Sequence, residues 1–133
     1  MLSNTGMSKE QIHDIAITVE TEFLADQSAP AQDHYVFSYT ITIENRGNIA
    51  VKLLRRHWII TDANNKIQEV EGEGVVGLQP HITPGHEFSY SSGAILATPV
   101  GCMEGSYKMV TDDGDEIIVP IPLFRLSSNI TMH

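Results

Sequence analysis

The sequence has little cysteine and few basic residues, and each shortage excludes a class of protein. Cys102 is the one cysteine among 133 residues, so an intramolecular disulfide cannot form and a disulfide-rich secreted scaffold is excluded. Eight lysine and arginine residues oppose 17 aspartate and glutamate residues, which gives a formal net charge of −9. Nucleic acids and anionic membranes are polyanions, so we expect this chain to bind neither of them.

Long apolar runs are absent as well. No stretch approaches the roughly 20 apolar residues that cross a bilayer as a helix, and residues 1–8 lack the apolar core of a signal peptide. These observations predict a cytoplasmic protein. With 41% hydrophobic and 19% charged residues, the chain has the composition of a folded domain. We expect residues 1–133 to form a single domain, with residues 1–11 and 127–133 as flexible arms because they lack alternation.

Apolar and polar residues alternate along much of the chain, which is the pattern of half-buried strands. The alternation is clearest in residues 15–23 and 35–43, which are rich in β-branched and aromatic side chains. Weaker alternation predicts further strands at residues 51–61, 66–76, 87–92, 107–111 and 116–121. Seven or eight short strands without a helix predict an all-β fold, an antiparallel β-sandwich, with a small barrel as the alternative. Pro120 and Pro122 predict that the last strand is an edge strand or ends there.

The segment Gly72–Gly77 matches the pattern G-x-G-x-x-G of dinucleotide-binding loops. In those loops the glycines let the backbone approach a pyrophosphate at a helix N-terminus. Here Pro80 and Pro84 prevent a helix from following, and Glu71 and Glu73 would repel a phosphate. Glycines that allow close backbone packing in a strand or bulge are the better interpretation, with a phosphate site as the alternative.

Half of the basic residues fall within eleven positions of this acidic chain: Arg46, Lys52, Arg55 and Arg56. In a regular strand, Lys52, Arg56 and Trp58 share one face, because neighbouring side chains point to opposite sides. A guanidinium group beside an indole ring binds an anion or stacks on the ring. The simpler interpretation is that Arg56 packs on Trp58 and pairs with a carboxylate.

No constellation of residues indicates catalysis or a metal site. His81 and His86 are five residues apart in a loop of proline and glycine, which is not the spacing of a metal-binding pair. The acidic run at residues 112–116 fails the calcium-loop pattern and fits a hairpin turn. The run Ser91-Ser92-Gly93 lacks the nucleophile elbow of serine hydrolases. We therefore expect a protein without catalytic residues, metal ligands or a cofactor.

Several longer stretches form a more specific signal than any single motif: residues 39–45, 56–62, 70–77, 79–80, 84–85, 90–93, 98–101, 103–107 and 121–126. Through these stretches, taken in order, residues 35–126 resemble the ApaG family, also called CorD, which occurs in many bacteria. Leu78 departs from the family pattern, since an acidic residue is usual there. His81 and His86 lie in the adjoining loop, where the family has no fixed histidine.

The resemblance implies a fibronectin type III-like or immunoglobulin-like sandwich, in agreement with the alternation. It also implies a noncatalytic module for protein–protein interaction, because domains of this family occur in F-box proteins and in a DNA-polymerase-interacting protein. The bacterial family is further linked to cobalt tolerance and magnesium efflux. We expect an unidentified protein partner, and exposed strand edges also allow a homodimer.

The candidate binding residues come from the basic cluster, the glycine segment and the adjoining proline loop: Arg56, Trp58, Gly72, Gly74, Gly77, Gln79 and Pro80. Two alternatives to protein binding remain. One is a phosphate or nucleotide ligand at Gly72–Gly77 with Arg56 as its counter-charge. The other is the handling of divalent cations.

Overall fold

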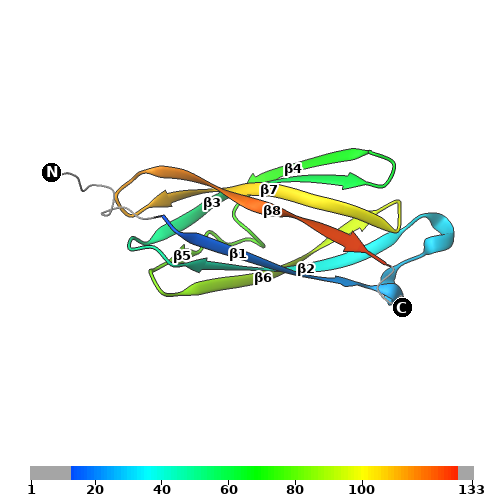
Figure 1. The fold of residues 1–133 in the computed structure, drawn as a ribbon, viewed down its shortest axis with the longest axis horizontal. Coiled ribbons are helices and arrows are strands. Elements are labelled where there is room, and N and C mark those ends of the chain that lie inside the picture. The colour runs from blue at the N-terminus through cyan, green and yellow to red at the C-terminus, as the bar shows by residue number, and fades with distance from the viewer. Residues whose placement is uncertain (1–12, 129–133) are drawn as a thin grey trace.

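Two antiparallel β-sheets packed face to face form the structure, a computed structural model that describes residues 13–128 (Figure 1). The strands are β1 (Ile15–Phe23), β2 (Tyr35–Asn45), β3 (Val51–Asp62), β4 (Ile67–Glu73), β5 (His81–Ile82), β6 (Glu87–Leu96), β7 (Val100–Thr111) and β8 (Glu116–Ser127). One sheet has the order β1-β2-β6, and the other has the order β4-β3-β7-β8, with β5 paired to β3. The predicted all-β sandwich is confirmed, and the proline-containing β8 is an edge strand.

Alternate side chains of each sheet fill the space between the two layers. On β2, Phe37, Tyr39, Ile41 and Ile43 are buried, and the residues between them are half-buried. The facing sheet contributes further large side chains, among them Tyr107 of β7, which is fully buried. Because successive side chains of a strand point to opposite faces, one apolar face per sheet is enough to build this core.

Strand β4 lies outside the core, at the edge of the larger sheet (Figure 1). All of its residues except Gly72 are exposed. Among the described strands it pairs with β3 alone, and none of the three strands of the smaller sheet makes extensive contact with it. The loop that follows it therefore begins at an open margin of the sandwich.

Strand β3 changes the face that it buries partway along its length. Leu53 is buried in its first part and Trp58 in its second, and the register with β7 shifts around Leu54. This extra residue is a β-bulge, which reverses the alternation of the strand. The prediction that Lys52 shares a face with Arg56 and Trp58 is therefore wrong. Lys52 points outward, whereas Arg56 lies on the inner side with Trp58.

Several element boundaries differ from the predicted ones. β7 begins at Val100, seven residues before the predicted strand, and β8 continues past both prolines to Ser127. β5 lies in a segment that the sequence marks as a turn, and the loop at residues 25–33 contains two short 3₁₀ turns. Of the expected arms, residues 1–11 and 129–133 lie outside the described residues. Within residues 13–128, no helix has the length and apolar character needed to span a membrane.

Candidate functional site

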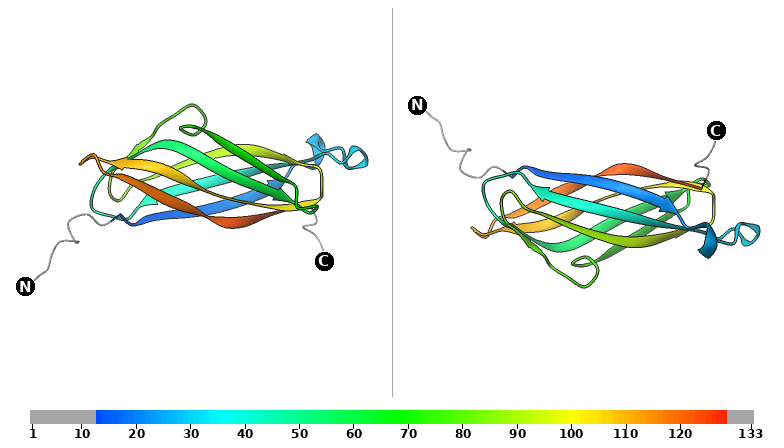
Figure 2. Two further views of the ribbon diagram at one scale, coloured as in Figure 1. Left: turned by 90° about the horizontal axis from the view of Figure 1, so that it is seen from above. Right: turned by 90° about the horizontal axis from the view of Figure 1, so that it is seen from below.

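The segment after β4 is a tight hairpin turn that stands out from the body of the sandwich (Figure 2). Val75 and Leu78 exchange both backbone hydrogen bonds, at 2.8 and 2.9 Å. Between them, Val76 and Gly77 have φ angles of +42° and +83°, the combination that defines a type I′ turn. Val75 is fully buried, whereas Val76 and Leu78 are 55% and 52% exposed. The G-x-G-x-x-G segment is therefore a strand end and a turn, with no helix after it.

Arg56 reaches from β3 to the base of this turn. Its Nη1 atom donates hydrogen bonds to the carbonyl oxygens of Glu73 and Gly74, at 3.1 and 3.0 Å. The guanidinium group lies over Gly72, where an added Cβ would come within 2.8 Å of Nη1. Among the described residues, Arg56 forms no ion pair with a carboxylate. The expected carboxylate pairing is therefore wrong, and Gly72 provides the space that the guanidinium group occupies.

A cleft of about 320 Å³ opens between the two sheets next to this guanidinium group. It is lined by residues of β2, β3, β4, β6 and the turn: Tyr39, Arg56, Trp58, Glu73, Val75, Val76, Gly77, Tyr90 and Ser92. We call it the Arg56 cleft. Three of the candidates from the sequence, Arg56, Trp58 and Gly77, meet at its walls, although they come from separate parts of the chain.

The aromatic residues of the Arg56 cleft are almost completely buried. Trp58 is 3% exposed and packs against Tyr39 and Phe124, with ring centroids 5.4 and 5.8 Å away. Its indole Nε1–H group has no hydrogen-bond partner among the described residues. Burial raises the pKa of both Tyr39 and Tyr90, against smaller opposing effects of hydrogen bonds and of Arg56. Both hydroxyls therefore stay neutral, and Arg56 provides the positive charge of the cleft.

The remaining candidates hold the turn in place. The side-chain Nε2 of Gln79 donates to the carbonyl oxygen of Leu54, at 3.0 Å, and the Pro80 carbonyl accepts a hydrogen bond from β3. Gly74 has a φ of +65°, and an added Cβ there would overlap the carbonyl oxygen of Leu78. These contacts tie the turn to the bulge of β3 and fix it beside the Arg56 cleft.

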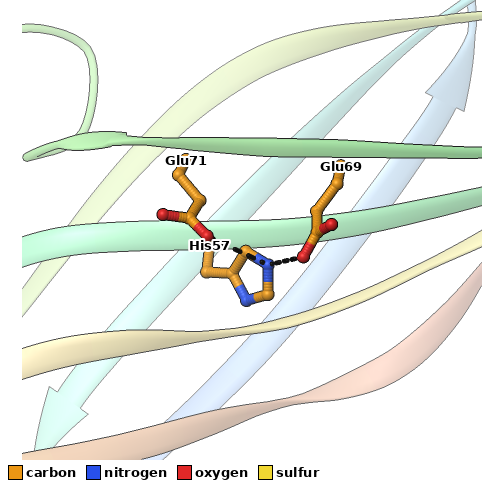
Figure 3. A group of neighbouring side chains, drawn as sticks. All are labelled: His57, Glu69 and Glu71. Carbon is orange, nitrogen blue, oxygen red and sulfur yellow. Dashed lines mark hydrogen bonds and ion pairs between the residues drawn. The ribbon is translucent and has the colours of Figure 1, made fainter.

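A second polar group lies on the outer face of β3 and β4 (Figure 3). The Nε2 atom of His57 is 2.6 Å from Oε2 of Glu69 and 3.7 Å from Oε2 of Glu71. One potential ligand atom from each residue lies within 4.8 Å of the others, and both glutamates are exposed. Imidazole nitrogen and carboxylate oxygen are donors that bind divalent cations. We call this set the His57 group.

The His57 group and half of the Arg56 cleft are not predicted from the sequence. His57 lies directly opposite Glu71 in the pairing of β3 with β4, a pairing that no short spacing reveals. Tyr39, Tyr90 and Ser92 come from strands whose positions across the sandwich the alternation does not give. The available signal was that all three lie in stretches that carry the family resemblance.

Comparisons with curated proteins agree with that resemblance. A family model described as the ApaG domain matches residues 25–111. Protein ApaG of Thiobacillus denitrificans is 54% identical over 127 residues, which cover 96% of this chain and 100% of the relative. Protein ApaG of Acidithiobacillus ferrooxidans is 51% identical over 120 residues, which cover 90% of this chain and 94% of the relative.

Solved structures give the same result. The crystal structure of a Bordetella pertussis protein designated ApaA matches with a TM-score of 0.87 and 44% identity, covering 90% of this chain and 97% of the other. A second X-ray structure matches with a TM-score of 0.84 and 49% identity, covering 90% of each chain. Family model, relatives and structures all extend over most of the sequence, and this chain belongs to the ApaG family.

Proposed function

We propose that this chain is a noncatalytic binding module that acts by contacting another protein. The observation that supports this most directly is Val76, an exposed β-branched residue with a positive φ at the tip of a protruding turn. L-residues with branched side chains disfavour that conformation, and strain of this kind gathers at functional sites. Leu78 adds a second exposed apolar side chain next to it. An apolar turn beside a charged cleft suits contact with a partner.

The chemistry of the Arg56 cleft also supports binding over catalysis. Its tyrosine hydroxyls are kept protonated by burial, because burial disfavours the phenolate and raises the pKa of both Tyr39 and Tyr90. A neutral tyrosine with a raised pKa is a poor general base and a poor nucleophile near pH 7. Arg56 supplies a fixed charge that orients a bound group and leaves it unchanged.

Capture from an extract of the source cells tests the proposal. The immobilised chain is compared with the double variant Val76→Asn, Leu78→Ser, which suits the type I′ turn and removes its apolar surface. Ile95→Ser is the matched control, because it removes an equally exposed apolar side chain from β6. We expect at least one protein to be enriched by the unaltered chain and by the Ile95→Ser control, but not by the double variant. Equal capture by all three chains would contradict the proposal.

Binding of divalent cations is the second candidate function, in line with the family's link to cobalt tolerance and magnesium efflux. The His57 group is the observation that favours it. Calorimetric titration with cobalt and with magnesium compares the chain with the variant Glu69→Gln, Glu71→Gln. Saturable heat that the variant loses would support a direct role. Without saturable heat in the unaltered chain, any effect on cations acts through a partner.

We further propose that the protein acts in the cytoplasm and that its partner is neither nucleic acid nor membrane, since the net charge is −9. A homodimer through the edge of β4 is the less favoured arrangement. Glu69, Glu71 and Glu73 share the outer face of that strand, and antiparallel pairing with a second copy would bring like charges together.

A further inference from the structure

We propose that the Arg56 cleft binds a carboxylate group, supplied by an acidic side chain or a chain terminus of the protein partner. This inference rests on the proposed function, because it names the chemical group by which the partner is recognised. The expected ligand is a planar group with a single negative charge, so small carboxylates can test the inference before any partner is known.

The guanidinium group of Arg56 is positioned for such a ligand. Its hydrogen bonds with described residues are both made by Nη1, to the carbonyl oxygens of Glu73 and Gly74. These two bonds fix the plane of the group, while its other N–H groups face no carboxylate within the described chain. A guanidinium group held in this way donates to a carboxylate at little further cost in side-chain entropy.

Trp58 adds an unpaired hydrogen-bond donor to the wall of this cleft. Its side chain is 97% buried, since 3% is exposed, and its Nε1–H group lacks a hydrogen-bond partner in residues 13–128. A buried donor without an acceptor costs about 1–3 kcal/mol. Trp58 lines the same cleft as Arg56, and a small shift of the buried side chains around Nε1 would let an acceptor bound at Arg56 also accept from the indole N–H.

A carboxylate fits this cleft better than a phosphate. Glu73 is among the residues that line the cleft, and its carboxylate lies 3.9 Å from Arg55 on the outer face. At that margin it repels a phosphate dianion more strongly than a carboxylate monoanion. Phosphate loops also need free backbone N–H groups, but here those of Gly74, Val75 and Leu78 donate to carbonyl oxygens of the protein. The volume of about 320 Å³ and the apolar walls at Val75 and Val76 suit a side chain or a chain end.

Trp58 is the chain's one tryptophan, so its indole N–H resonance reports the cleft without ambiguity. The test follows that resonance and the backbone amides by NMR at constant ionic strength. The probes are N-acetylglutamate α-amide, which carries a side-chain carboxylate, and N-acetylglutamine, which carries a terminal one. The neutral N-acetylglutamine amide is the control, and inorganic phosphate is the competing anion. We expect saturable shifts with at least one carboxylate probe and none with the neutral control, and the stronger probe identifies the source of the carboxylate.

Three variants complete the test. Arg56→Gln should weaken binding roughly tenfold or more, because it removes a charge-assisted hydrogen bond. Lys52→Gln removes a positive charge from the outer face of β3, away from the Arg56 cleft, and binding should be unchanged. Glu73→Gln should tighten binding roughly twofold to fivefold by removing repulsion. Glu73→Gln keeps both hydrogen bonds of Arg56, because they are made to backbone carbonyl oxygens. Its result therefore tests the proposal even if Arg56→Gln fails to fold.

Either of two results would overturn the inference: carboxylate probes that act like the neutral control, or tighter binding of phosphate. The proposed function fails separately, in the capture experiment. If the double variant Val76→Asn, Leu78→Ser captures the same proteins but carboxylate binding persists, the turn is not the contact surface and the cleft remains a carboxylate site. If capture depends on the turn but no carboxylate binds, the partner is recognised by apolar contact alone.

Discussion

Val76 has a backbone conformation that its own side chain opposes. In a type I′ turn the first central position favours asparagine or glycine, and a β-branched residue there is strained. Val76→Asn should therefore stabilise the isolated protein by about 1 kcal/mol, because it relieves this strain at a side chain that is more than half exposed. The midpoint of urea-induced unfolding measures the effect. A lower midpoint would mean that the valine packs favourably in the isolated chain, and the argument from strain to function would fail.

Gly72 leaves the space that the guanidinium group of Arg56 occupies, so a side chain at this position should displace that group. In Gly72→Ala, the new Cβ would lie within 3.0 Å of three guanidinium atoms, so the flexible end of Arg56 must move. We expect stability to change by less than about 1 kcal/mol, while carboxylate binding in the Arg56 cleft weakens. Gly93→Ala is the matched control, since its Cβ would make only an ordinary contact at 3.5 Å. Unchanged binding in Gly72→Ala would show that the position of Arg56 does not control the cleft.

Asn45 connects three elements at the end of β2. Its side-chain Nδ2 donates to the carbonyl oxygens of Ile49 and Ile82, and its Oδ1 accepts from the amide of Gly47. The side chain is 1% exposed, so none of these bonds can be replaced by bulk water. Asn45 therefore joins the β2–β3 turn to the short strand β5. The alternation of apolar and polar residues does not predict this connection.

Asn45→Ala should destabilise the protein by about 2–4 kcal/mol, because it leaves buried backbone groups without partners. Asn45→Asp should be at least as costly at neutral pH, since its carboxylate would face two carbonyl oxygens. Urea-induced unfolding measures both, with the exposed Asn64→Ala as the control, for which we expect a change within about 0.5 kcal/mol. A loss below about 1 kcal/mol in Asn45→Ala would show that this turn forms without the side chain.

The elements with clear alternation were the ones that the sequence predicted well. β1 and β2 begin within one residue of their predicted starts, because each has one apolar and one polar face throughout. Lys52 was assigned the wrong face relative to Arg56 and Trp58, because the bulge at Leu54 reverses the alternation of β3. The carbonyl oxygen of Leu54 accepts from Gln79, a contact that periodicity does not reveal. β5 has two residues and exists through its pairing with β3, so no periodic pattern could reveal it.

The candidate site depends on how the two sheets are placed on one another. Arg56 and Trp58 could be chosen from composition, because they combine a cation and an indole within three positions. The neutral hydroxyls around them could not, since Tyr39 lies in β2 and Tyr90 in β6 of the opposite sheet. Residue type and spacing thus predict one wall of the Arg56 cleft, and only the packing of the sandwich supplies the other.

The buried tyrosines of the core make the free energy of unfolding sensitive to pH in the alkaline range. Burial raises the pKa of Tyr39, Tyr90 and Tyr107 above the ordinary value of 10.0, and the Tyr90 and Tyr107 hydroxyls share a hydrogen bond of 2.5 Å. In the unfolded chain these groups lose their protons near pH 10, whereas in the folded protein they keep them. The unfolded state therefore binds fewer protons above pH 10, and the free energy of unfolding falls as the pH rises.

Tyr90 and Tyr107 each contribute up to about 1.4 kcal/mol per pH unit above pH 10, so the two together approach about 3 kcal/mol per unit, and Tyr39 adds to this slope. Below pH 9 they have no effect on the pH dependence, because all three are protonated in both states. Urea-induced unfolding at intervals from pH 8 to pH 11.5 measures the slope, and Tyr107→Phe should reduce it by about a third to a half. A stability that stays constant through pH 11 would mean that the hydroxyls ionise in the folded protein. In that case the interior of the sandwich would be open to water, and the Arg56 cleft would lose the dry surroundings that make an unpaired guanidinium group a strong anion site.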